Sequence, residues 1–145
     1  MIRLFIGYDA REAVVYHVCV NSIIRQASQP VAVTPLALKN LGRYVERHRD
    51  GSNPFIYSRF LVPQLMGFSG WALYIDGDML LRADIAELWN LRDESKAVLC
   101  VHHNYKTKMK EKYEGKPTCN FRLDLGTVNS VLWNPTHKFV DLDEM

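Results

Sequence analysis

The sequence predicts an α/β fold in which buried strands form a sheet covered by helices. The first observation is an apolar run, residues 71–75, that leads directly into Asp76-Gly77-Asp78. Short apolar runs are typical of strands buried on both faces of a parallel sheet, and open α/β folds bind ligands at the carboxyl ends of such strands. The second observation is that the chain opens with a strand, a turn and a helix, which is the building unit of this class.

The opening unit spans residues 2 to about 27. Residues 2–6 are apolar, and Asp9 followed three residues later by Glu12 has the pattern of a capping box, which predicts that a helix begins here and continues to Ala27. The residues at helical spacing that we expect to face the core are Ala13, Val14, His17, Val18, Asn21 and Ile24. Residues 31–36 predict a second, short strand.

The remaining elements follow in order. Ser58 is expected to cap a helix that continues to Met66, although Pro63 would lie inside it. A short helix is predicted for residues 83–89, and two further strands for residues 97–101 and 128–133. The short helix should pack through Ile85, Leu88 and Trp89.

Size and composition indicate a single globular domain, residues 1–145. The chain is 48% hydrophobic and has a net charge of +2, which gives no indication of a nucleic-acid partner. No apolar run approaches the roughly 20 residues of a membrane span, and no signal peptide precedes the first strand. The cysteines, Cys19, Cys100 and Cys119, have no metal-ligand spacing. An odd cysteine count without an export signal predicts a cytoplasmic protein.

Asp76 and Asp78 are the first candidates for a functional site. Gly77 between them can adopt positive φ, so the backbone is expected to turn there and bring both carboxylates together. Two such carboxylates repel each other, and a divalent cation that prefers oxygen ligands relieves the repulsion. If the strands are parallel, Tyr8 and Asp9 lie at the same edge. The alternative reading is an acidic β-turn without a ligand.

Two segments resemble glycosyltransferases of the GT-A fold, most closely family 8 and its bacterial and phage-like relatives. Residues 57–65 are similar to the helix after the family's Tyr-x-Arg segment, and residues 74–89 to its Asp-x-Asp strand with the following Asp-Ile-x-Glu-Leu-Trp helix. The resemblance extends from Ile2 to about Asn134. It implies a Rossmann-like nucleotide-sugar-binding sheet flanked by helices.

The resemblance also implies roles for single residues. Asp76 and Asp78 match the pair that holds Mn²⁺ or Mg²⁺ between the two phosphates of a nucleotide sugar, and Gly77 joins the donor-binding set. Tyr8 and Asp9 match the first turn, where the family contacts the base and ribose.

Two further donor-binding residues come from the same comparison. Arg59 matches a basic residue that reaches the donor's phosphate or sugar, with a helix-surface salt bridge as the alternative. Asn129 begins a segment similar to the family's Asn-Ser-Gly-Val-Leu-Leu-Trp-Asn, although this chain lacks the glycine.

The implied activity is a metal-dependent, retaining transfer of a sugar from a nucleotide-sugar donor, expected to be UDP-linked, to a glycan, lipid or protein acceptor. Family members continue past this point with a metal-binding histidine and a Lys-Pro-Trp segment, so the chain resembles a donor-binding portion truncated at its C-terminus. We expect apolar surface left open on the sheet and on the helix that carries Ile85, Leu88 and Trp89 to favour a homo-oligomer.

Two other functions remain open from the sequence. A non-catalytic nucleotide-sugar-binding module is compatible with the short chain. In a phosphatase of the haloacid dehalogenase type, an apolar strand also ends in Asp-x-Asp, and the first aspartate is the nucleophile. That class expects Thr or Val where this chain has Met79, and a later acidic pair for which only Asp141 and Asp143 are available.

Overall fold

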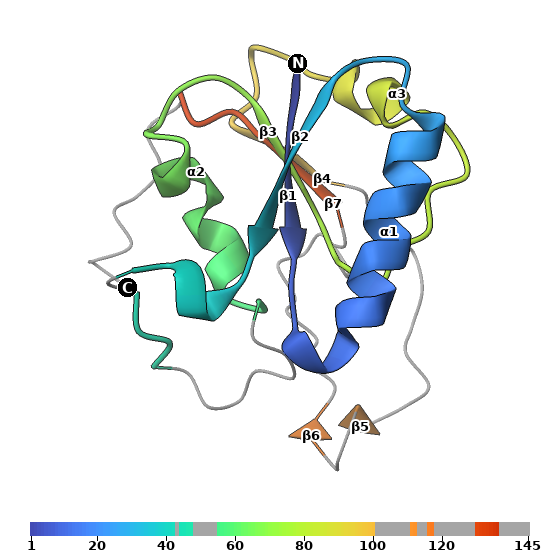
Figure 1. Ribbon diagram of the computed structural model, residues 1–145. Helices are drawn as coiled ribbons and strands as arrows, with labels where there is room; N and C mark the ends of the chain where they lie inside the picture. Colours follow the sequence, from blue (N-terminus) through green and yellow to red (C-terminus); the bar gives the residue numbers. More distant parts are fainter. Residues whose placement is uncertain (43, 48–54, 101–110, 113–115, 118–129, 137–145) are drawn as a thin grey trace.

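The computed structural model describes residues 1–42, 44–47, 55–100, 111–112, 116–117 and 130–136 (Figure 1). The strands are β1 (Ile2–Gly7), β2 (Val31–Leu36), β3 (Ala72–Ile75), β4 (Val98–Cys100), β5 (Glu111–Lys112), β6 (Lys116–Pro117) and β7 (Ser130–Trp133). The α-helices are α1 (Ala13–Gln26), α2 (Val62–Leu65) and α3 (Ile85–Trp89). Short 3-10 turns comprise Ala10–Glu12, Leu38–Asn40 and Ser58–Leu61. No helix in this described part has the length and apolarity of a membrane span.

The main sheet has five strands in the order β2-β1-β3-β7-β4. β1 pairs in parallel with both β2 and β3, as predicted, but β7 is antiparallel to β3 and to β4. The sequence did not reveal this reversal because burial on both faces determines a strand's composition and not its direction. The sheet is therefore mixed, which is common among large α/β sheets.

Alternate side chains of β1 and β3 enter two separate cores. Leu4 and Leu73 pack on the side of α1 and α3, whereas Phe5 and Tyr74 pack on the side of α2. Figure 1 shows the same arrangement, with α1 and α3 on one face of the sheet and α2 on the other. All four residues of β3 are buried, so this strand has the two-sided burial that its apolar run predicted.

The predicted core face of α1 is wrong. Val14, Val18 and Ile24 are 76%, 51% and 63% exposed. The buried residues of α1 are instead Tyr16, Cys19, Ser22 and Ile23. The inward face accepts a serine because the Ser22 hydroxyl donates to the carbonyl of Cys19 (2.7 Å) and accepts from the amide of Leu81 (3.0 Å). This polar link ties α1 to the segment that follows Asp78.

The start of α1 follows the capping-box prediction only in part. The Asp9 carboxylate accepts from the amide of Arg11 (2.9 Å) and caps the 3-10 turn that precedes the helix. Glu12, however, makes no side-chain cap hydrogen bond. The turn displaces the helix start to Ala13 and takes Glu12 out of the position where a capping box would need it.

The predicted helix from Ser58 to Met66 is two short pieces, a 3-10 turn followed by α2. Ser58 is fully buried, and the N-cap position belongs to Tyr57, which makes no side-chain cap hydrogen bond. Pro63 lies in the first turn of α2, where its missing N–H would have had no partner in the helix. Pro63 is therefore compatible with α2, because it lies at the start of this helix and not in its interior.

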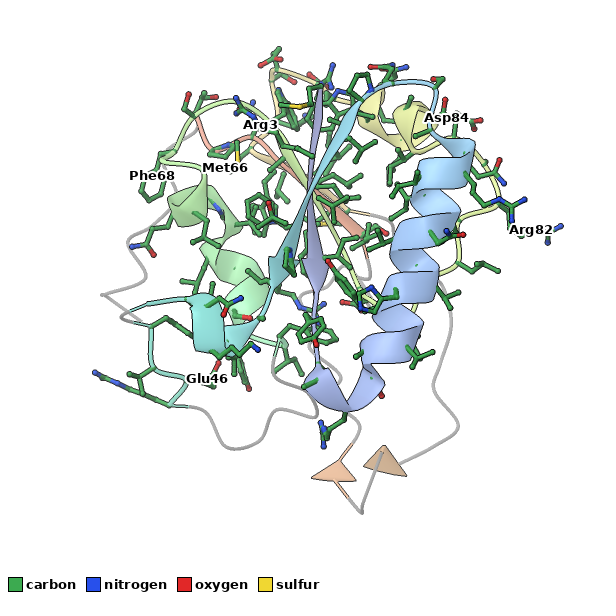
Figure 2. The ribbon with its side chains drawn as sticks, viewed as in Figure 1. Arg3, Glu46, Met66, Phe68, Arg82 and Asp84 are labelled. Atoms are coloured by element: carbon green, nitrogen blue, oxygen red, sulfur yellow. The ribbon has the colours of Figure 1, made fainter. Side chains whose placement is uncertain are left out.

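Asp84 positions α3 against the end of α1 (Figure 2). Its carboxylate accepts from the amide of Ala86 (2.9 Å) as an N-cap and from the amide of Ser28 (3.2 Å). Ile85 and Trp89 are only 2% and 9% exposed. The expectation of open apolar surface on this helix is therefore wrong, and the homo-oligomer stays a prediction without support from α3.

Gly77 is needed for space and not for an unusual backbone angle. Within the described residues the glycines with positive φ are Gly42, Gly67 and Gly70, so the predicted turn at positive φ is wrong for Gly77. A Cβ on Gly77 would lie 2.3 Å from the carbonyl oxygen of Gly7. The ends of β1 and β3 thus approach so closely that no side chain fits between them.

This contact predicts that Gly77→Ala destabilises the fold by about 3 kcal/mol or more, because a backbone oxygen cannot move aside as a side chain can. Gly67→Ala is the control, since a Cβ there meets no atom within 4 Å. It should lose only the about 1–2 kcal/mol of a residue with positive φ. Urea denaturation of both variants measures the difference, and a smaller loss for Gly77→Ala would contradict the packing argument.

Candidate functional site

The candidate site lies where β1 and β3 end side by side. The register aligns Ile6 with Ile75, so the residues that follow each strand meet at one edge of the sheet. The ring of Tyr8 packs edge-on against Tyr16, with centroids 5.1 Å apart. The Tyr16 ring in turn lies 3.7 Å from where a Cβ of Gly77 would be. Tyr8 is therefore at the predicted edge, next to the turn that carries the two aspartates.

The Asp76 carboxylate is held by two side chains. Its Oδ1 accepts a hydrogen bond from the Tyr74 hydroxyl at 2.7 Å and lies 3.2 Å from Nη2 of Arg59. Only 15% of the Asp76 side chain and 13% of the Arg59 side chain are exposed. A carboxylate removed from water in this way needs a compensating charge, and the guanidinium provides it.

Arg59 comes from the 3-10 turn before α2 and is fixed from several directions. Its Nε donates to the carbonyl oxygen of Phe55 (3.3 Å), and its guanidinium lies 5.1 Å from the ring centre of Tyr74 and 5.9 Å from that of Phe55. Arg59 does form an ion pair, but the pair is largely buried and includes a candidate site residue. The alternative of a helix-surface salt bridge therefore does not describe it.

Tyr74 is a site residue that the sequence analysis missed. Burial, and next the negative charge of Asp76, raise the pKa of Tyr74 well above its ordinary value, so the phenol stays neutral and donates to the carboxylate. The signal was present in the alternation of a strand, since residues two apart face the same side. Gly7 was also missed, and here the sequence gives no signal, because only the structure shows that the Tyr74 hydroxyl approaches it.

Asp78 differs from Asp76 in being exposed, and within the described part of the chain it makes no hydrogen bond or ion pair. Nearby, burial raises the pKa of the Cys19 thiol to about 11, with a smaller contribution from the charge of Asp78. Cys19 is therefore a protonated core residue and a poor metal ligand, since thiolates and not thiols bind metals.

The described residues contain no group of three or more His, Cys, Asp or Glu side chains that could hold a metal ion. What they offer at this edge is the pair of carboxylates, Asp76 and Asp78. Carboxylate oxygens suit Mg²⁺ and Mn²⁺, and Mg²⁺ commonly binds one or two carboxylates together with substrate phosphates and water. The residues present therefore fit a hard divalent cation that also binds a phosphorylated ligand.

The remaining predicted residues have different outcomes. Asp9 is 6% exposed, and its carboxylate accepts from Nε and Nη2 of Arg11 at 3.0 and 2.7 Å. Hydrogen bonding from Arg11 lowers the pKa of Asp9, so this carboxylate is an anion that stabilises the turn after β1. Asn129 lies outside the described residues. Its neighbour Ser130 begins β7, with its hydroxyl 3.8 Å from the sulfur of Met79.

Asp141 and Asp143, considered above as the later acidic pair of a phosphatase, also lie outside the described residues.

Comparison with known proteins identifies the family. The model of glycosyl transferase family 8 matches residues 20–135. The chain belongs to this family. It is 42% identical over 117 residues to Protein CDI of Arabidopsis thaliana, a match that covers 78% of this chain and 45% of that protein. The match therefore spans less than half the length of this relative.

A solved structure supports the same fold. The apo structure of the bifunctional glycosyltransferase WbbM aligns with 93% of this chain and 31% of that one, with a TM-score of 0.63 and 18% sequence identity. At this identity the likeness concerns the fold alone. The predicted α/β sheet of the GT-A class, flanked by helices, is confirmed.

The burial of the Arg59–Asp76 pair predicts that Arg59→Ala lowers the free energy of unfolding by about 1.5–3 kcal/mol, the usual range for hydrogen bonds to charged groups. Arg82→Ala is the control, because Arg82 is an exposed arginine. Its removal should change the free energy of unfolding by less than about 0.5 kcal/mol. Equal changes for both variants in urea denaturation would show that the Arg59–Asp76 pair does not stabilise the fold.

Proposed function

We propose that the chain is a single nucleotide-sugar-binding domain, residues 1–145, of a metal-dependent, retaining glycosyltransferase that uses a UDP-sugar. The observation that carries the proposal is the placement of Asp76 and Asp78 directly after the buried strand β3, at the edge where β1 also ends. Family 8 membership supports sugar transfer, and open α/β sheets bind ligands at this edge.

In this proposal Asp76 and Asp78 hold Mn²⁺ or Mg²⁺. The cation would bind the diphosphate and stabilise the negative charge that develops on it as the leaving group. Arg59 lies against Asp76 and would supply a second positive charge to the phosphates or the sugar. A guanidinium is suited to this contact because its planar N–H groups match phosphate oxygens.

Tyr8 would stack on or border the base and ribose, since its ring lies at the same edge and is half-buried. Asp9 would act with it, chiefly by fixing the turn through Arg11. Gly77 would let the donor's phosphates approach the backbone, and Asn129, which precedes β7 in the sequence, would contact the donor. The acceptor, whether glycan, lipid or protein, is left open by these residues.

A direct test is to titrate UDP into the protein by calorimetry with and without Mn²⁺. We expect binding that depends on Mn²⁺, and Asp78→Asn should weaken it at least tenfold, which corresponds to about 1.4 kcal/mol. The control is Glu87→Gln, which neutralises an exposed carboxylate on α3 and should leave the affinity unchanged. The same heat with and without Mn²⁺ in all three proteins would remove the metal from the proposal.

Sugar-transfer turnover, and not UDP binding, distinguishes a transferase domain from a non-catalytic binding module. A transferase domain should release UDP from a UDP-sugar, to water or to an acceptor, in a Mn²⁺-dependent reaction that Asp78→Asn abolishes. Mn²⁺-dependent UDP binding without any sugar release from the donors tested would favour the binding module.

A further inference from the structure

One buried side chain contacts both charged members of the candidate site. Tyr74 is fully buried in β3, its hydroxyl donates to Oδ1 of Asp76, and its ring lies under the guanidinium of Arg59 at 5.1 Å. The ring also belongs to the core that includes Phe55 and Val62. The hydroxyl is therefore anchored by strand pairing on one side and by core packing on the other.

The position of this hydroxyl depends on a glycine in the neighbouring strand. A Cβ on Gly7 would lie 2.8 Å from the Tyr74 hydroxyl oxygen and 2.6 Å from the ring of Phe55. Because Gly7 has no side chain, the hydroxyl passes the end of β1 and reaches the carboxylate beyond it. The carbonyl oxygen of Phe55 in turn accepts a hydrogen bond from Nε of Arg59. Gly7 and Phe55 thus shape the space in which Tyr74, Asp76 and Arg59 meet.

We propose that Tyr74 is a positioning residue for the cation and donor site, with its hydroxyl orienting the Asp76 carboxylate and its ring orienting the Arg59 guanidinium. This inference rests on the proposed function, in which Asp76 binds the cation. It assigns to Tyr74 no direct contact with the cation or the donor.

The physical basis is the difference between a carboxylate that rotates freely and one that is held. A carboxylate after a strand end has several orientations, and binding a cation must select one of them. A hydrogen-bond donor that is fixed in the core, such as the Tyr74 hydroxyl, holds the carboxylate in that orientation before the cation binds. This lowers the conformational entropy that is lost on binding. Groups that orient metal ligands in this way typically change metal affinity 10–100-fold when they are removed.

The test uses Mn²⁺ alone, followed by the loss of the electron paramagnetic resonance signal of the free ion. Tyr74→Phe keeps the ring and removes only the hydroxyl, so we expect a folded protein that binds Mn²⁺ 10–100-fold more weakly. Circular dichroism and thermal melting check the fold of each variant.

The chain offers a matched control. Tyr44 also donates its hydroxyl to an acidic side chain two residues later, Glu46, at 2.6 Å. Glu46 lies in the segment after β2, on the left of Figure 2, and has no proposed role in the site. Tyr44→Phe removes the same kind of hydrogen bond and should leave Mn²⁺ affinity unchanged.

A double-mutant cycle with Asp76→Asn shows whether Tyr74 acts through Asp76. If it does, Tyr74→Phe has little further effect on Mn²⁺ affinity once Asp76 is changed. An equal fall in both backgrounds would overturn the positioning role, as would a Tyr74→Phe protein that binds Mn²⁺ as tightly as the wild type. Those results would leave the proposed function in place. A wild-type chain that does not bind Mn²⁺ would instead overturn the cation site and this inference with it.

Discussion

The close parallel pairing of β1 with β3 is the constraint on which the candidate site depends. β1 ends at Gly7 and β3 at Ile75, and a Cβ on Gly77, in the turn after β3, would lie 2.3 Å from the carbonyl oxygen of Gly7. This approach brings the turn after β1, with Tyr8, next to the turn that carries Asp76 and Asp78. It also opens the space through which the Tyr74 hydroxyl reaches Asp76. A side chain at Gly77 would separate the strand ends and the polar groups that they carry, and one at Gly7 would collide with the Phe55 ring and the Tyr74 hydroxyl.

The electrostatics of the site follow from the different surroundings of two carboxylates only two residues apart. Asp76 is largely removed from water and is compensated by Arg59 and Tyr74, whereas Asp78 is exposed to solvent. One carboxylate is therefore held in place before any ligand arrives, and the other is accessible to it. This combination is suited to a cation that brings further ligands of its own, such as the phosphates of a nucleotide.

The sequence predicted the strands of the five-stranded sheet well, because buried strands have a distinctly apolar composition, but it did not predict β5 and β6. Residues 31–36 match β2 without error, and the run before Asp76 is the fully buried β3. The direction of β7 could not be predicted, since an apolar strand has the same composition in either direction. The core face of α1 was predicted wrongly because that face includes Ser22, whose hydroxyl is satisfied by Cys19 and Leu81. A polar residue with tertiary partners does not stand out in an apolar periodicity.

The sequence predicted the site residues that belong to a family motif. It did not predict the contacts between them. Asp76, Asp78 and Arg59 were found from the family resemblance, but the ion pair between Arg59 and Asp76 required the structure. We propose that Asp76 and Asp78 share a divalent cation with a nucleoside diphosphate, and a crystal structure with Mn²⁺ and UDP, with data collected for the anomalous scattering of manganese, tests this arrangement. We predict one anomalous peak between the two carboxylates and the diphosphate. A peak elsewhere, or UDP bound at this edge without one, would contradict the account.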